Sequence, residues 1–240
     1  MTDAAPALRL DAALALLAHA GIEPPGGEPG SPAWLQGVID ALCELSSRDP
    51  LTGLANRRQF QIVLARELDR VARAGEPALL LLLDIDHFKR VNDEHGHAAG
   101  DLVLKAVAQS LQESVRPMDT VARVGGEEFG IVLPNCPPAF GPTVAERIRR
   151  RIARRAVTVG AGEPLTVTVS LGGAFAPQWV RSSAALWMER ADKQLYRAKA
   201  EGRNRAVFEP AAISSVSPEE KGLLFAIAGP GPADSKDATA

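Results

Sequence analysis

The feature that most constrains the fold is an unbroken apolar run, ALLLLLDID, at residues 78–86. A strand with one solvent-facing side alternates apolar and polar residues, whereas a strand covered on both sides is apolar throughout. The run therefore predicts a strand buried on both faces of a sheet. It ends in Asp84 and Asp86, which are expected to share one face because strand side chains alternate.

Helical and strand patterns alternate along the following residues. The segment opened by Asn56 has apolar residues at helical spacing and stops at Gly75. The elements predicted beyond the buried strand are two helices, the second over 101–115, two short strands around residues 125–126, a helix over 142–155, a strand over 165–175 and a helix over about 183–201. This order predicts an α/β fold, a sheet flanked by helices with a tight hairpin.

Composition divides the chain into five predicted parts. They are a short amphipathic helix within 1–23, a Pro/Gly linker at 24–32, a stalk helix at 33–48, a main domain at 49–209 and a mostly disordered tail at 210–240. Ser31 followed by Pro32 is predicted to cap and open the stalk helix.

The stalk helix carries a short heptad seam of Leu35, Val38, Leu42 and Leu45. Two interpretations stay open for it. The seam packs against its own chain, or it pairs with a second copy as a dimerising coiled coil.

Composition also excludes several classes of protein. The net charge is −2, which gives no general attraction to nucleic acid or anionic lipid. No apolar run approaches the ~18 residues of a membrane span. The only cysteines are Cys43 and Cys136, too few for a disulfide framework. We therefore expect a cytoplasmic globular protein without nucleic-acid or membrane partners.

The stretch RVGGEEFG at residues 123–130 is predicted to be a β-hairpin. Gly125 and Gly126 are expected to supply the positive φ angles of a two-residue turn. Glu127 and Glu128 then begin the returning strand and point to opposite faces. Taken alone, the motif also fits a solvated hairpin tip.

The end of the buried strand predicts a cation and phosphate site. Carboxylates such as Asp84 are costly to bury without a compensating charge, and oxygen ligands without nearby cysteines suit Mg²⁺. Helix amides beginning near His87 and Phe88, together with Lys89, would suit phosphate oxygens. The alternative for Asp84 is a helix N-cap. His95 and His97 lack the partners of a zinc site.

Near the end of the main domain, Lys199 and Arg203 are spaced to share one helical face. They fit either a solvated basic face or a clamp for a polyphosphate.

Five sequence motifs follow one another along the chain, and together they make the functional interpretation specific. They are DPLTGLANRR at 49–58, DIDHFKRVND at 84–93, HGHAAGD at 95–101, GGEEF at 125–129 and AKAEGRN at 198–204. Together they resemble the GGDEF family of diguanylate cyclases over about 49–209. The resemblance implies a nucleotidyl cyclase or palm-like fold, a central mixed sheet flanked by helices with an active-site β-hairpin.

The resemblance also implies an activity, the condensation of two GTP into cyclic di-GMP and two pyrophosphates. Each domain would hold one GTP, so a homodimer is expected. The implied cofactor is Mg²⁺, two ions per active site, with Mn²⁺ as the substitute.

Site roles follow from the resemblance residue by residue. Asp84, Glu127 and Glu128 are the implied catalytic residues, with Glu127 helping to deprotonate the attacking 3′-hydroxyl. The implied metal ligands are Asp84, Ile85 and Glu128. The implied substrate-binding residues are Asn92 and Asp101 for guanine, Lys89, Lys199 and Arg203 for the triphosphate, His87 and Phe88 beside it, and Gly125 and Gly126 for nucleotide clearance.

A product-binding site is implied upstream of the hairpin. RPMD places Arg116 and Asp119 where the family carries an inhibitory RxxD site, so cyclic di-GMP is expected to bind there and slow the enzyme. Arg147 matches a second arginine that completes this site from a neighbouring domain.

Two other functions remain as alternatives. One is a catalytically inactive receptor for cyclic di-GMP or GTP, although such receptors usually lose the acids retained here. The other is a module that docks a protein partner through residues 217–227, where a capping box precedes apolar residues.

Overall fold

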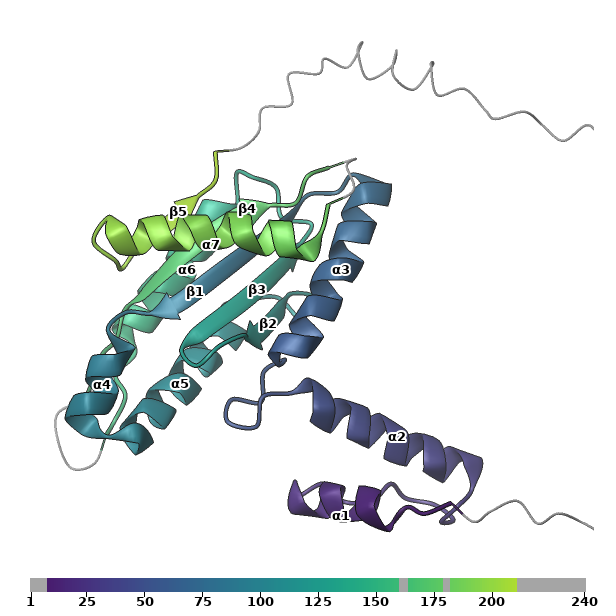
Figure 1. The fold of residues 1–240 in the computed structure, drawn as a ribbon. Coiled ribbons are helices and arrows are strands. Elements are labelled where there is room, and N and C mark those ends of the chain that lie inside the picture. Colours follow the sequence, from purple (N-terminus) through teal and green to yellow (C-terminus); the bar gives the residue numbers. More distant parts are fainter. Residues whose placement is uncertain (1–7, 160–163, 179–181, 211–240) are drawn as a thin grey trace, which may run out of the picture. The chain divides into compact units, whose positions relative to one another are not determined.

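The computed structural model describes residues 8–159, 164–178 and 182–210. Figure 1 shows a sheet with helices along it. The described elements are α1 (Asp11–His19), α2 (Pro32–Ser47), α3 (Arg57–Ala74), β1 (Ala78–Ile85), α4 (Phe88–His95), α5 (His97–Gln112), β2 (Thr120–Arg123), β3 (Glu128–Pro134), α6 (Gly141–Arg154), β4 (Val169–Phe175), α7 (Ala184–Ala200) and β5 (Ala206–Phe208). Residues 217–227 lie outside the described residues.

The sheet has five strands in the order β2-β3-β1-β4-β5, with β1 at the centre. β1 pairs antiparallel with both β3 and β4, and β4 pairs parallel with β5. The sheet is therefore mixed, as predicted. All eight residues of β1 are buried, which confirms the interpretation of the apolar run.

The two faces of β1 enter two separate cores. Leu79, Leu81 and Leu83 belong to a cluster that includes apolar residues of α5 and α6. Leu80 and Leu82 belong to a second cluster with residues of α3 and α7. Both faces are thus covered by helices, which is why the strand carries no polar residue before Asp84.

Several predicted helix ends are confirmed. The Asn56 side chain accepts a hydrogen bond from the Gln59 amide and caps α3, which ends at Gly75 with φ 67°. Ser31 caps α2 in the same way, with Pro32 in its first turn. The predicted strand over 165–175 is too long, because β4 begins only at Val169.

α7 lies directly on β4. A Cβ atom on Gly172 would lie 2.1 Å from the backbone nitrogen of Leu195 and 2.3 Å from the carbonyl oxygen of Ala191. Glycine at this position therefore permits the close approach, which fixes the height of α7 over the sheet.

α2 packs against α1 within the chain. Leu17 of α1 and Val38 of α2 are buried in one apolar cluster, and the other three seam residues pack against it. Of the two interpretations of the seam, the structure displays packing against its own chain. No helix among the described residues is long and apolar enough to cross a membrane.

Candidate active site

The pairing of β1 with β3 brings the predicted acids together. Asp84 is the direct cross-strand neighbour of Glu128. The Ile85 amide donates to the carbonyl oxygen of Glu127 at 3.3 Å. Residues more than forty positions apart in sequence therefore meet at the end of the central strand.

The turn of the hairpin differs from the prediction. Neither Gly125 nor Gly126 has a positive φ, so a primed two-residue turn is wrong. The amides of Val124 and Gly125 both donate to the carbonyl oxygen of Glu128, at 2.9 and 3.3 Å, which closes a wider loop. A Cβ on Gly125 would lie 2.3 Å from Glu128 Oε2. The Glu128 carboxylate thus folds over Gly125, and any larger residue there would have to displace it.

Arg123 holds this loop and was not among the residues predicted for the site. Its Nη2 and Nε donate to the carbonyl oxygen of Gly126 at 2.7 and 3.2 Å. Its Nη1 lies 3.3 Å from both carboxylate oxygens of Asp49. The available signal was a basic residue beside the GGEE motif and an aspartate in DPLTGL, with no local pattern linking them.

Asp84 is a buried carboxylate among other acids. It is 5% exposed, and Lys199 Nζ lies 2.8 Å from its Oδ2. Burial raises the pKa of Asp84, with a further rise from the charge of Asp86, although Lys199 and Arg203 oppose the shift. Burial likewise raises the pKa of Glu127, as do the charges of Asp84 and Glu128. The cluster therefore favours the approach of additional positive charge.

Asp86 has a different role from Asp84. Its carboxylate accepts from Thr168 Oγ1 at 2.7 Å, Ser170 Oγ at 2.6 Å and the Asn204 amide at 3.0 Å. Three donors satisfy it, so it ties β1 to β4 and to the loop after α7. Asp86 also lies beyond the end of β1, and the N-cap position of α4 is His87 rather than Asp84.

Unusual backbone angles gather around Asp86. His87 follows it with φ 58°, and Arg203 and Asn204 have φ 61° and 46°. Such conformations are costly for residues other than glycine and occur often at functional sites. No side chain caps the first turn of α4 among the described residues, but the Arg90 amide already donates to the carbonyl oxygen of His87 at 2.9 Å, so only the amides before Arg90 are open to an anion.

The pair predicted to read guanine lies on two adjoining helices, α4 and α5. A Cβ on Gly100 would lie 2.0 Å from Asn92 Oδ1, so Asn92 rests against the residue that precedes Asp101. Asp101 is exposed at this position. The fold therefore brings the neighbourhoods of both side chains together.

Comparison with known proteins places the chain in a family. A family model described as diguanylate cyclase, GGDEF domain, matches residues 46–205. The chain belongs to the GGDEF family. The GGDEF domain is 46% identical over 157 residues to the diguanylate cyclase DgcP of Pseudomonas aeruginosa, covering 65% of this chain and 23% of that protein.

Other relatives agree. The chain is 41% identical over 175 residues to the response regulator PleD of Caulobacter vibrioides, covering 72% of this chain and 38% of that protein. A crystal structure of the coiled coil and GGDEF domain of DgcB from Caulobacter crescentus, in complex with c-di-GMP, matches with a TM-score of 0.69 and 34% identity, covering 73% and 92% of the two chains. The chain spans less than half the length of the curated relatives it matches.

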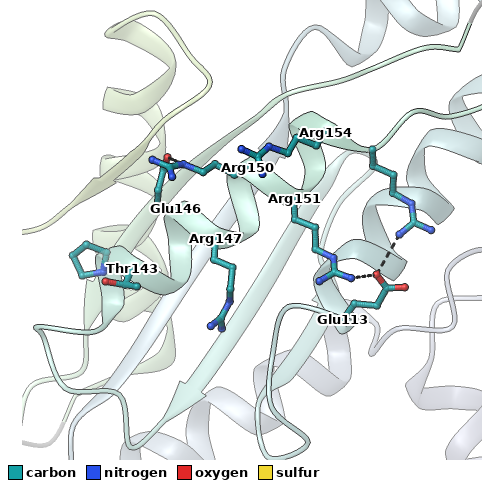
Figure 2. A pocket seen from close by; sticks show the side chains of 9 residues that line it. Glu113, Thr143, Glu146, Arg147, Arg150, Arg151 and Arg154 are labelled. Carbon is teal, nitrogen blue, oxygen red and sulfur yellow. Dashed lines mark hydrogen bonds and ion pairs between the residues drawn. The ribbon is translucent and has the colours of Figure 1, made fainter.

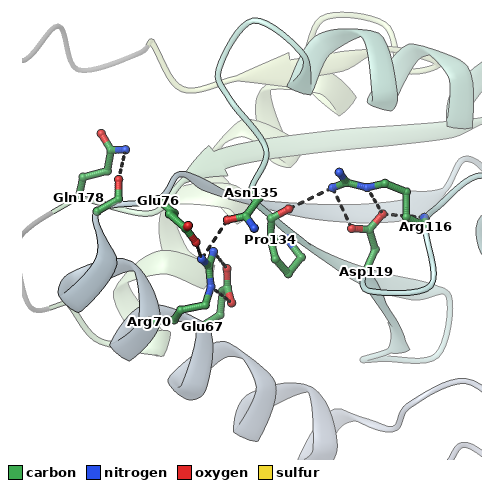
Figure 3. A network of polar contacts seen from close by, with 9 residues as sticks. Glu67, Arg70, Glu76, Arg116, Asp119, Pro134, Asn135 and Gln178 are labelled. Atoms are coloured by element: carbon green, nitrogen blue, oxygen red, sulfur yellow. Dashed lines mark hydrogen bonds and ion pairs between the residues drawn. The ribbon is translucent and has the colours of Figure 1, made fainter.

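The RPMD motif of the GGDEF domain forms a tight local unit, shown in Figure 3. Arg116 Nη2 lies 3.1 Å from Asp119 Oδ1 and donates to the carbonyl oxygen of Pro134 at 3.0 Å. The Asp119 side chain is 2% exposed, whereas that of Arg116 is 51% exposed. In this structure Asp119 therefore orients Arg116, and the arginine is the accessible member of the pair.

Arg147 on α6 lies near the same segment. Its Nη2 donates to the carbonyl oxygen of Ser114 at 2.8 Å. Figure 2 shows it among further arginines of α6 along an open groove of about 850 Å³. Arg147 therefore contacts the segment that immediately precedes Arg116.

Proposed function

We propose that residues 49–209 condense two GTP into cyclic di-GMP and two pyrophosphates. The observation that carries the proposal is the cross-strand pair of Asp84 and Glu128, with Glu127 beside it and Lys199 on Asp84. The family to which the chain belongs, and the diguanylate cyclases among its relatives, support this reaction class.

The donor set fits a hard divalent cation. Burial and mutual repulsion raise the pKa of Asp84 and Glu127, so a cation would relieve the cluster. Within the described residues no three His, Cys, Asp or Glu side chains converge on one point. We assign the carboxylates of Asp84 and Glu128 and the carbonyl oxygen of Ile85 as the ligands. Mg²⁺ is usually held by such a small set plus substrate phosphates. When bound, a pair of Mg²⁺ ions activates the hydroxyl and stabilises charge on the transferring phosphate.

Other residues of this chain accept the proton and bind the triphosphate. Glu127 accepts the proton of the 3′-hydroxyl, because its raised pKa makes it a better base than an exposed glutamate. Lys89, Lys199 and Arg203 supply positive charge for the triphosphate. The backbone amides at the start of α4, near His87 and Phe88, suit its oxygens.

Guanine is read by Asn92 and Asp101. Asp101 accepts from the N1–H and amino group of guanine, which adenine cannot supply. A site built to pair such donors rejects the base that lacks them.

Product binding and dimer formation complete the proposal. Arg116, oriented by Asp119, binds cyclic di-GMP, and Arg147 of a second copy completes the site. Because each domain holds one GTP, turnover needs two copies facing one another.

The test is to incubate the purified chain with GTP and either Mg²⁺ or Mn²⁺ and to identify the products by mass spectrometry. We expect cyclic di-GMP and pyrophosphate, with no cyclic product from ATP. Binding of cyclic di-GMP without turnover under all conditions would instead indicate a receptor.

A further inference from the structure

α1 and α2 form a helical hairpin whose apolar side chains meet in one cluster. Leu17 of α1 is 0% exposed, Val38 of α2 is 2% exposed and Trp34 is 7% exposed. The apolar residues packed around these three are Leu10, Ala13, Leu14, Ile22, Leu35, Ala41, Leu42 and Leu45. Figure 1 shows the two helices side by side.

The heptad seam of α2 contributes one buried residue to this cluster and three partly buried ones beside it. Leu35, Leu42 and Leu45 pack against it, and Val38 is at its centre. A coiled coil with a second copy needs the same side chains as its interface. One helix face cannot contact α1 and a second chain at once, so the two contacts exclude one another.

Local contacts favour the docking of α1 onto its own α2. Gly21 follows α1 with φ 70°, and the Ile22 amide donates to the carbonyl oxygen of Leu17 at 2.9 Å. This is the arrangement of a glycine-ended helix. The linker also touches α2, because a Cβ on Gly37 would lie 2.7 Å from the Cβ of Pro25.

The contact is small enough to open. α1 has nine residues, and an isolated helix of that length is marginal in water. Its helical state therefore depends on α2, and segments of this kind open locally at low cost.

We propose that α1 competes, within the chain, for the face of α2 through which a second copy docks. While α1 is docked, Val38 is buried and the three leucines of the seam are partly covered, so the chains stay apart. When α1 is released, the seam pairs two chains. The effect on cyclic di-GMP synthesis rests on the proposed function, whereas the competition itself concerns dimer formation.

The test uses two glutamate substitutions on the same helix. Leu17→Glu places a charge inside the buried cluster and is expected to release α1. Leu16→Glu is the matched control, because Leu16 is 58% exposed. Both variants leave the GGDEF domain unchanged.

Dimer formation is measured on the full chain by energy transfer. Cys43 on α2 is exposed and Cys136 is buried, so a maleimide dye reports on α2. Donor-labelled and acceptor-labelled chains are mixed and titrated in concentration. If α1 covers the seam in nine chains of ten, both chains of a dimer must release it, so full release strengthens dimerisation by about a hundredfold, tenfold for each chain. We expect that shift in Leu17→Glu, no shift in Leu16→Glu, and loss of energy transfer when Leu42→Glu is added to Leu17→Glu.

Three results would overturn the competition. They are equal dimerisation by Leu17→Glu and the wild type, an equal shift in both single variants, and unchanged energy transfer in the double variant. Turnover is measured in parallel. If Leu17→Glu dimerises as expected but no variant makes cyclic di-GMP, the competition stands and the proposed function fails.

Discussion

Asp84 and Asp86 are two residues apart, and their surroundings separate their roles. Asp86 accepts from three donors, so its charge is balanced within the fold. In the part of the chain that the structure describes, Asp84 has a single ion pair, with Lys199, and lies near the negative charge of Asp86. Its carboxylate is therefore less fully balanced than that of Asp86 and can interact with a cation or substrate. Residue type and position alone did not distinguish the two.

The proton-accepting role of Glu127 is tested by Glu127→Gln. We expect kcat to fall by about 10²–10⁴-fold with little change in KM for GTP, because the substitution removes the base and keeps the shape. Glu189→Gln is the control, an exposed glutamate on α7 that lines the same cavity as Glu128. A kcat for Glu127→Gln equal to that of the control would rule out the assignment.

Guanine recognition is tested through Gly100. Gly100→Ala would push on Asn92 Oδ1, which lies 2.0 Å from the new Cβ position. We expect KM for GTP to rise more than kcat falls, and the preference for GTP over ATP to weaken. Ala98→Ser, an exposed change in the same helix, should alter neither quantity. Unchanged steady-state kinetics in Gly100→Ala would show that Asn92 does not take part.

At the scale of elements, α7 can pack this closely on β4 because Gly172 has no side chain. A Cβ atom at this position would clash with backbone atoms of Leu195 and Ala191, which cannot rotate away. Since α7 carries Lys199, its height over the sheet also sets where that charge meets Asp84.

Gly172→Ala should therefore destabilise the domain. Overpacking of this kind costs about 1–3 kcal/mol, and backbone contacts place the change at the upper end. Denaturant unfolding measures the difference. Gly26→Ala is the control, because no atom lies within 4 Å of its new Cβ and its φ is not positive. Equal midpoints for the two variants would show that α7 moves freely.

A second link between elements joins the segment after α2 to the hairpin. Burial opposes ionisation of Asp49, but hydrogen bonds from Thr52 and the charge of Arg123 outweigh it and lower the pKa of Asp49. Arg123 in turn holds Gly126. Asp49 therefore stabilises the loop that carries Glu127.

This link predicts a pH-dependent stability. Since the folded-state pKa of Asp49 is lowered, its stabilisation is present above the ordinary value of 3.8 and is lost as pH falls through the lowered pKa. Asp49→Asn should cost about 1.5–3 kcal/mol of unfolding free energy at pH 7. That cost should shrink towards zero at the acid end of a pH series.

The control for this series is Asp40→Asn. Asp40 is exposed on α2 and accepts only from Gln36 among the described residues, at 2.9 Å. Its effect should stay within about 0.5 kcal/mol at every pH. A cost for Asp49→Asn that does not change with pH would contradict the ionic origin.

At the scale of the whole domain, one strand joins the two proposed ligand sites. β3 begins at Glu128 in the active site and ends at Pro134, whose carbonyl oxygen Arg116 holds. The next residue, Asn135, is held by Arg70 of α3 at 2.9 Å (Figure 3). Product bound at Arg116, as proposed, would therefore contact the far end of the strand that carries Glu128.

Product inhibition is tested by Arg116→Ala. Loss of one charge-assisted contact, worth about 1.5–3 kcal/mol, should weaken cyclic di-GMP binding by at least about tenfold. Progress curves should then stay linear where those of the wild type slow. Arg66→Ala, an exposed arginine on α3, is the control. Equal inhibition of both variants by added cyclic di-GMP would leave RPMD as a structural turn alone.

Local sequence patterns were enough to predict most of the helices and strands and to identify the motifs in their order. A strand that is buried on both faces must be apolar on both sides, so the run of apolar residues was enough to predict β1. Helix caps such as Asn56 and Ser31 bond to amides only three residues away, so they too can be predicted from the local sequence. Periodicity and capping are local, which is why these predictions hold.

The tertiary structure decided what depends on contacts between distant residues. Only the pairing of strands could show that Asp86 is satisfied by β4, that Arg123 joins Asp49 to Gly126, and that Gly125 makes room for Glu128 rather than for a positive φ. The seam of α2 gave the same heptad pattern for either partner. In this structure α1 packs against the seam. The heptad spacing could not predict that contact, because an apolar face packs against whichever apolar surface lies near it and fits its shape.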